Sequence, residues 1–134
     1  MCLYPTEKGL KKYDGKRNIF KFYKVFEIVD NTLRTPFRKY IISKPGRINL
    51  PKNSALDIEK NLYGYTTING GCFHAYDFKR HNNMYNGWRV MIPIYVRGKD
   101  IIAADHTHGT VCFFSYEIKK EDWNKAFKWK LLLM

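Results

Sequence analysis

The longest regular alternation of apolar and polar positions covers residues 19–29, IFKFYKVFEIV. Large apolar side chains fall on one face of this segment, namely Phe20, Phe22, Phe26 and Ile28. The opposite face carries Lys21, Tyr23, Val25 and Glu27. A period of two is the spacing of a β-strand, in which successive side chains point to opposite faces. We therefore predict a strand over residues 19–29 whose apolar face packs against the core.

Further strands follow from the same pattern and from the turn residues between them. Asp30 and Asn31 predict a turn, and residues 36–42 (PFRKYII) predict a second strand that forms a hairpin with the first. Residues 88–98 predict another strand, with Pro93 at an edge or a bulge because proline cannot donate a ladder hydrogen bond. Two more strands are expected over 100–104 and 110–118, and the polar residues 79–86 predict an exposed loop.

Two segments have helical spacing. Ser54 is a candidate N-cap for a short helix over residues 55–62, which Gly64 would end. Near the C-terminus, spacings of three and four residues separate Trp123, Ala126, Phe127 and Lys130. This spacing predicts an amphipathic helix that closes the core.

The size and composition of the chain predict one domain. It has 134 residues, of which 45% are hydrophobic, enough for a single core. Five or more short strands with one or two helices favour an α+β fold with a mainly antiparallel, curved sheet. We expect residues 1–18 to be a basic, flexible lead-in and residues 19–134 to form the domain. No run approaches the ~18 apolar residues of a membrane span, so no membrane partner is expected.

The charge balance directs attention to anionic partners. Lys and Arg number 24 against 12 acidic residues, which gives a net charge of +12. Such an excess favours nucleic acid, nucleotides or anionic surfaces. The sequence contains no G-x-x-x-x-G-K motif and no G-x-G-x-x-G motif, so nucleotide hydrolysis by those routes and a bound cofactor are not expected.

Basic and aromatic residues are interleaved within the predicted strands. The set with this placement is Lys21, Tyr23, Arg38, Tyr40, Arg89, Tyr95 and Arg97. On a sheet face, tyrosine and arginine stack on bases while cations pair with phosphates. We therefore predict that these residues bind an anionic nucleotide or nucleic acid without catalysis. A pocket for one nucleotide is preferred to a polymer site, because no recognised nucleic-acid motif is present.

The stretch GGCFHAYD, residues 70–77, places a thiol and an imidazole two positions apart. On a strand Cys72 and His74 would share a face, so they could form a nucleophile and its base. Phe73 and Tyr76 beside them favour instead a buried structural thiol and a core histidine. Three cysteines without a C-x-x-C pair, and no recognisable signal peptide, favour a reduced chain in the cytoplasm.

A second histidine pair offers an alternative metal site. His106 and His108 alternate within DHTHG, and their imidazoles would project together if this segment were extended. His74 or Cys112 could complete three ligands. Gly109 and the flanking polar residues favour a turn here instead, so we expect no metal.

Several short elements occur in an order that resembles a group of small uncharacterised proteins of phages, other viruses and bacteria. The elements are FYKVFEI, the Thr35-Pro36-Phe37 step, GCFHAY, IPIYVRGKDIIAA and FSYEI, within residues 1–118. This chain departs from the group's G-F-H-A motif by placing Cys72 between Gly71 and Phe73. The resemblance implies a structural role for Gly71, Phe73, His74 and Ala75.

The same resemblance implies a viral accessory protein that interferes with host defence, in the host cytoplasm, by binding an anionic nucleotide or nucleic acid and so sequestering a host signal. Some members resemble a reduced ADP-ribosyltransferase fold, which would make a small enzyme the alternative. In that case His74 and Glu117 are the candidate catalytic residues, since such an enzyme needs a late glutamate. A protein-protein interaction module with a host protein is the third alternative.

Overall fold

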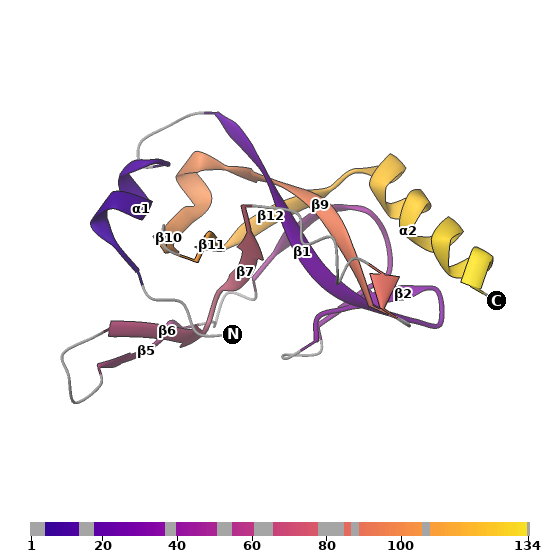
Figure 1. Ribbon diagram of the computed structural model, residues 1–134, viewed down its shortest axis with the longest axis horizontal. Helices are drawn as coiled ribbons and strands as arrows, with labels where there is room; N and C mark the ends of the chain where they lie inside the picture. The colour runs from indigo at the N-terminus through magenta and orange to yellow at the C-terminus, as the bar shows by residue number, and fades with distance from the viewer. Residues whose placement is uncertain are drawn as a thin grey trace.

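The computed structural model describes residues 5–13, 18–36, 40–50, 55–60, 66–77, 85–86, 89–105 and 108–133. In chain order the elements are α1 (Glu7–Lys11), β1 (Ile19–Val29), β2 (Thr32–Arg34), β3 (Ile41–Ile42), β4 (Gly46–Asn49), β5 (Asp57–Lys60), β6 (Thr66–Gly70), β7 (Phe73–Tyr76), β8 (Tyr85–Asn86), β9 (Arg89–Arg97), the 3-10 helix η2 (Gly98–Asp100), β10 (Ile101–Asp105), β11 (Thr110–Phe113), β12 (Ser115–Ile118) and α2 (Lys120–Leu133). Figure 1 shows their arrangement, in which α1 and α2 lie at opposite ends of a twisted sheet.

One sheet contains most of the strands. Its main order is β10-β11-β7-β1-β9-β12-β4, with β2 and β3 attached beside β1 and β8 beside β9. Neighbouring strands run antiparallel. β5 and β6 form a separate two-stranded sheet, which projects from one side of the molecule (Figure 1). The predicted α+β domain with a mainly antiparallel, curved sheet is therefore confirmed.

β1 and β9 form the centre of this sheet, and both were predicted. They pair without a break from Ile19↔Arg97 to Glu27↔Arg89. On its other side, β9 pairs with β8 near residues 89–90 and with β12 at Tyr95. β9 is a central strand that pairs with β1 without a bulge across Pro93, so neither the predicted edge nor the predicted bulge is found there. Pro93 lies between the pairings with β8 and β12, so its missing N–H interrupts neither.

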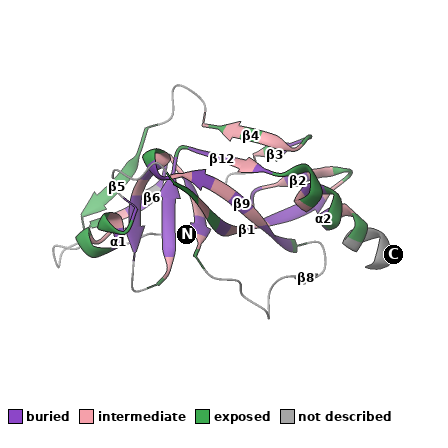
Figure 2. Ribbon diagram, turned by 90° about the horizontal axis from the view of Figure 1, so that it is seen from above, coloured by how far each residue is buried: buried purple, intermediate pink, exposed green. Residues whose placement is uncertain are grey.

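The core lies on the face of the sheet to which Phe22 and Phe26 of β1 point. Of the apolar face predicted for β1, Phe22, Phe26 and Ile28 are buried, and Phe20 is half-buried and packs against the core. The buried residues of the other strands include Ile92, Ile94, Val111 and Phe113. Phe73 and Tyr116 join them, with ring centroids 4.9 Å apart in edge-to-face geometry. Figure 2 shows this burial along the centre of the sheet.

The strand that forms the hairpin with β1 lies earlier in the chain than the strand predicted over residues 36–42. Asp30 and Asn31 both have positive φ, 51° and 41°, the backbone that a tight hairpin turn requires. β2 therefore pairs with β1 from Thr32, directly after the turn. Pro36 lies in a turn after β2, and only residues 41–42 of the predicted segment form a strand among the described residues.

The helix predicted over residues 55–62 is wrong where the structure describes it. Residues 57–60 form β5, which pairs with β6, while Ser54 lies outside the described residues. All four residues of β5 are exposed. A helix here would have no core against which to bury its apolar face, whereas pairing with β6 satisfies the backbone hydrogen bonds.

The segment expected to be a flexible lead-in is ordered over residues 5–13. Thr6 caps α1 by accepting a hydrogen bond from the Gly9 N–H (3.0 Å), and its own N–H donates to the Ala104 carbonyl (3.0 Å). A side chain at Gly9 would collide with that carbonyl. Tyr13 is buried in the core. This segment has no apolar periodicity because a single ring anchors it to the core.

The C-terminal third follows the predictions more closely. The predicted strand over 110–118 is divided into β11 and β12 by Phe114, which is 41% exposed. The predicted C-terminal helix is α2, from which Trp123 and Ala126 enter the core. Of the loop predicted over 79–86, residues 79–84 lie outside the described residues and 85–86 form β8. No helix in the described part of the chain is both long enough and apolar enough to cross a bilayer.

Candidate functional site

The face of β1 and β9 that points away from the core carries four of the predicted ligand-binding residues. Lys21 and Tyr23 alternate with Phe22 along β1, so they point away from it. Lys21 pairs in register with Tyr95, and Arg97 lies two residues further along β9. Paired residues share a sheet face, so all four side chains lie on the same side.

A row of polar residues extends this face across two more strands. Tyr95 pairs in register with Glu117 of β12, and Glu117 pairs with Arg47 of β4. The row from Lys21 to Arg47 therefore crosses four strands, a width of about 14 Å at the usual strand spacing. We call Lys21, Tyr23, Arg47, Tyr95, Arg97 and Glu117 the outward face.

Lysine ammonium groups lie against two of the tyrosine rings. Lys21 Nζ is 5.7 Å from the ring centroid of Tyr23, and Lys119 Nζ is 4.1 Å from that of Tyr95. Both lysines are exposed and both rings are half-buried. At these distances each pair makes a cation-π contact, which holds the cation beside a partly accessible ring. Lys119 follows β12 directly and was not among the predicted residues.

Asp100 neutralises part of the positive charge on this face. Its Oδ2 accepts a hydrogen bond from Arg97 Nε (2.7 Å) and lies 4.0 Å from Arg47 Nη1. Arg47 also donates to the Ser115 hydroxyl (3.0 Å), which in turn donates to Asn49 Oδ1 (2.7 Å). Arg97, a predicted ligand-binding residue, is therefore already held in place by an ion pair with Asp100.

The remaining predicted residues lie elsewhere. Arg89 Nη2 is 3.7 Å from Glu27 Oε1, and Arg34 Nη2 donates to the other carboxylate oxygen (2.7 Å), so this cluster belongs to the far end of β9. Tyr40 does not join the outward face, because its ring packs edge-on against Phe73 in the core (5.9 Å). Arg38 lies outside the described residues.

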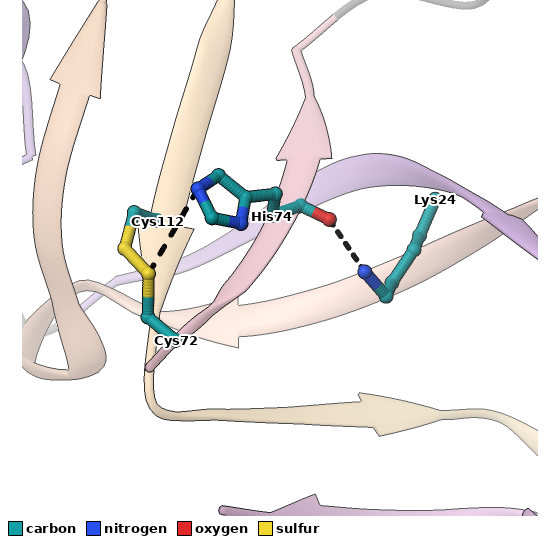
Figure 3. The surroundings of a disulfide bond; sticks show 4 residues. All are labelled: Lys24, Cys72, His74 and Cys112. Carbon is teal, nitrogen blue, oxygen red and sulfur yellow. Dashed lines mark hydrogen bonds between the residues drawn. A yellow bond between two sulfur atoms is a disulfide. The ribbon is translucent and has the colours of Figure 1, made fainter. Parts of the chain in front are cut away.

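A second cluster surrounds the bend between β6 and β7. Cys72 forms a disulfide with Cys112 of β11 (Figure 3). Cys72 Sγ also lies 3.9 Å from His74 Nε2, and His74 pairs in register with Cys112. Gly71 has a φ of +81°, and a Cβ there would collide with the Ala55 carbonyl. Only glycine fits this bend, which brings Cys72 up to β11.

The disulfide corrects the prediction of a reduced thiol at Cys72. Strand alternation places Cys72 and His74 on one face, but it cannot bring Cys112 beside them, because Cys72 and Cys112 are 40 residues apart in the chain. The sulfurs lie next to a small apolar cluster of Ile68 and Ala103. A disulfide removes the nucleophilic thiolate that the catalytic alternative requires.

Lys24 is a buried, ionisable residue that was not predicted from the sequence as a candidate site residue. It lies on the core face of β1 and is buried, and its Nζ donates to the His74 carbonyl (2.7 Å; Figure 3). The rings of Phe26 and Phe73 each lie 5.9 Å from the ammonium. Burial lowers the pKa of Lys24 from 10.5 to about 8. The available signal was a lysine at an inward position of an otherwise apolar strand face.

The two candidate catalytic residues lie on strands that are not neighbours in the sheet. His74 is on β7 and Glu117 on β12, with β1 and β9 between them in the sheet. Three strand spacings put them about 14 Å apart, too far for one to orient the other. The sheet order therefore gives no support to the pairing of His74 with Glu117.

Of the alternative metal pair, only His108 is described. Its Nδ1 lies 2.7 Å from Asp105 Oδ2, and its backbone N–H donates to Asp105 Oδ1 (3.3 Å). This arrangement closes the turn between β10 and β11, as the turn prediction implied. His106 lies outside the described residues.

Comparison of the chain with protein-family models, with curated proteins and with solved structures gave no match. The assignment of the site residues therefore rests on geometry.

Arg47 was not among the residues predicted from the sequence. It lies two residues after Pro45 and next to the inward-facing Ile48, so the alternation of a strand was the available signal.

Proposed function

We propose that this protein binds an anionic nucleotide or nucleic acid on the outward face, without a catalytic step, and that a single strand of nucleic acid is the ligand that fits best. The observation that carries this proposal is the row of Lys21 and Tyr95 with Lys119 against the Tyr95 ring. It combines accessible cations with an aromatic surface on regular strands, whose backbone holds both in place.

The chemistry of single-strand recognition requires this combination. Bases stack on aromatic side chains, which contributes about 1–3 kcal/mol per base and tolerates any base because every base has a π face. Lysine and arginine contribute through the phosphates. Tyr23 and Tyr95 are the stacking candidates, and Lys21, Arg47 and Lys119 are the phosphate-pairing candidates.

The local charge supports an anionic ligand. The outward face with Lys119 and Asp100 contains four basic and two acidic side chains, of which Asp100 is already paired with Arg97. Asp122 of α2 interacts electrostatically with Lys21 and Lys119. An anionic ligand would therefore compete with this carboxylate for the two lysines, which predicts stronger binding when Asp122 is removed.

The extent of the row favours a polymer over a single nucleotide. Its four strands span about 14 Å, and its members are exposed or half-buried. An extended strand contacts such an open surface at several phosphates. In the cytoplasm, a binder of this kind without turnover would sequester its ligand, which is the accessory role that the sequence resemblance implies.

The decisive experiment measures binding of labelled single-stranded oligonucleotides and of a mononucleotide panel at two salt concentrations. A polymer ligand should lose affinity steeply with salt, with a slope of about −0.7 per phosphate contacted. A site for one nucleotide should lose far less, which would keep binding on this face but replace the polymer with a small ligand.

The variants are chosen to separate this face from general charge. Tyr95→Ala should weaken binding by about 1–3 kcal/mol at either salt concentration, because it removes a stacking surface. Lys21→Ala should weaken binding mainly at low salt. Lys60→Ala is the matched control, since Lys60 is exposed on β5 in the separate hairpin. Equal losses in Lys21→Ala and Lys60→Ala, or no binding of any nucleotide by the folded protein, would refute the proposal.

A further inference from the structure

The side chains of Cys72, His74 and Cys112 form a compact set of metal-ligand atoms. Their sulfur and nitrogen atoms all lie within 4.8 Å of one another. His74 and Cys112 pair directly across β7 and β11, and Cys72 precedes β7 by one residue. Two neighbouring strands therefore hold His74 and Cys112, and the bend before β7 places Cys72 beside them.

The distances match those that a tetrahedral ion requires. With Zn–S near 2.3 Å and Zn–N near 2.0–2.1 Å, tetrahedral angles put sulfur about 3.6 Å from nitrogen and the two sulfurs about 3.8 Å apart. Cys72 Sγ is already 3.9 Å from His74 Nε2. The cysteine Cα atoms are 6.0 Å apart, so side-chain rotation alone can separate the sulfurs once the disulfide is broken.

We propose that reduction of the Cys72–Cys112 disulfide creates a binding site for a thiophilic divalent ion such as Zn²⁺. A dithiol reductant supplies two electrons and two protons and becomes a disulfide itself, which leaves two thiols in the protein. The ion then binds the two thiolates and the His74 imidazole, and the two thiol protons pass to solvent. The fourth position is left to water.

The same sulfurs cannot serve both states, so oxidation and metal binding exclude each other. Cys112 is buried beside Ile68 and Ala103, while Cys72 and His74 are half-buried and give an ion a route from solvent. Lys24 Nζ donates to the backbone carbonyl of His74, so this contact orients the β7 backbone. Soft thiolate and imidazole ligands select Zn²⁺ over Mg²⁺ or Ca²⁺.

The test is a cobalt titration of the whole chain, reduced with a phosphine under nitrogen and compared with the oxidised protein. Co²⁺ reports thiolate ligands through a sulfur-to-metal charge-transfer band and tetrahedral geometry through visible absorption. We expect one Co²⁺ per reduced chain, displacement by Zn²⁺, and no band in the oxidised protein. A reduced, folded protein that gives no charge-transfer band, or binds Mg²⁺ equally well, would overturn the proposal.

Substitutions then assign the ligands. His74→Gln should weaken Co²⁺ binding at least ~10-fold, since even outer-shell partners of metal ligands contribute about 10–100-fold. The control is the double variant His106→Gln/His108→Gln, which should bind normally. If the control loses binding and His74→Gln keeps it, the ion binds at the other histidines and the proposal fails.

Alkylation gives an answer that does not depend on any variant folding. In the reduced wild-type protein, Zn²⁺ should slow iodoacetamide labelling of the half-buried Cys72 while leaving Cys2 unaffected, as peptide mass spectrometry would show. Equal labelling of Cys72 with and without Zn²⁺ would contradict the proposal. Neither measurement involves nucleic acid, so this site and the outward face stand or fall separately.

Discussion

Lys24 offers the sharpest test of the core, because its ammonium is buried among aromatic rings. The change is Lys24→Met, which keeps the length and apolar stem of the side chain and removes the charge. Burial lowers the pKa of Lys24 from 10.5 to about 8. One pKa unit corresponds to about 1.4 kcal/mol. The protonated side chain therefore destabilises the folded protein by on the order of 3 kcal/mol at pH 7.

The sign of the pH dependence follows from that direction. Above pH 8 folded Lys24 loses its proton, while the unfolded chain keeps its proton up to about 10.5. The unfolded state then binds more protons, so the stability of the wild-type protein rises with pH across this window. Between pH 7 and pH 9.5 the gain from Lys24 amounts to about 2 kcal/mol, and Lys24→Met lacks it.

The assay is urea unfolding of both proteins at several pH values, in the oxidised state with a chelator present. The diagnostic quantity is the change with pH in the difference between their unfolding free energies. The lost hydrogen bond to the His74 carbonyl affects that difference at every pH and so does not mimic the trend. Burial raises the pKa of Tyr13 to about 12, a contribution that both proteins share.

The control is Lys60→Met, made in an exposed strand, which should leave the difference constant. If the wild-type and Lys24→Met curves stay parallel from pH 7 to pH 9.5, Lys24 is not held in a dehydrated environment. The account of the core face of β1 would then be refuted.

Two further predictions concern the disulfide and the buried tyrosine. The disulfide joins residues 40 apart in the chain, so the double variant Cys72→Ser/Cys112→Ser should lower the unfolding free energy by about 4 kcal/mol, because the unfolded chain is no longer cross-linked. Reduced wild-type protein should match this variant in metal-free urea titrations, and a variant as stable as the oxidised protein would contradict the prediction. The Tyr116 hydroxyl is buried with no hydrogen-bond partner in the described part of the chain, so Tyr116→Phe should raise stability by about 1 kcal/mol in the same assay, whereas a loss of that size would show that the hydroxyl is bonded.

The sequence predicted those parts of the fold that depend on local alternation. β1 and β9 were found because one face of each strand is continuously apolar, and their register then put Lys21 and Tyr95 together. α2 was found because its apolar spacing is helical over several turns. In these elements the local pattern and the tertiary structure agree.

The missed features depend on contacts between distant segments. The apolar spacing of residues 55–62 fits a helix, but pairing with β6 determines β5. Cys72 meets Cys112 only because β7 and β11 become neighbours in the sheet. Tyr40 resembled an outward strand residue, yet its ring packs on Phe73, since the chain turns back between β2 and β3. Strand order and tertiary packing cannot be read from periodicity alone.

The Cys72–Cys112 bond also has a mechanical consequence. It closes a covalent ring that contains β9, whereas β1 and β12, which flank β9 in the main strand order, both lie outside the ring. When the two ends of the chain are pulled, β1 and β12 can be peeled from β9, but the ring cannot be drawn out. Its 40-residue span shortens the fully stretched oxidised chain by about 140 Å, at roughly 3.5 Å per residue. The redox state of one bond thus determines how far this protein can be extended by force.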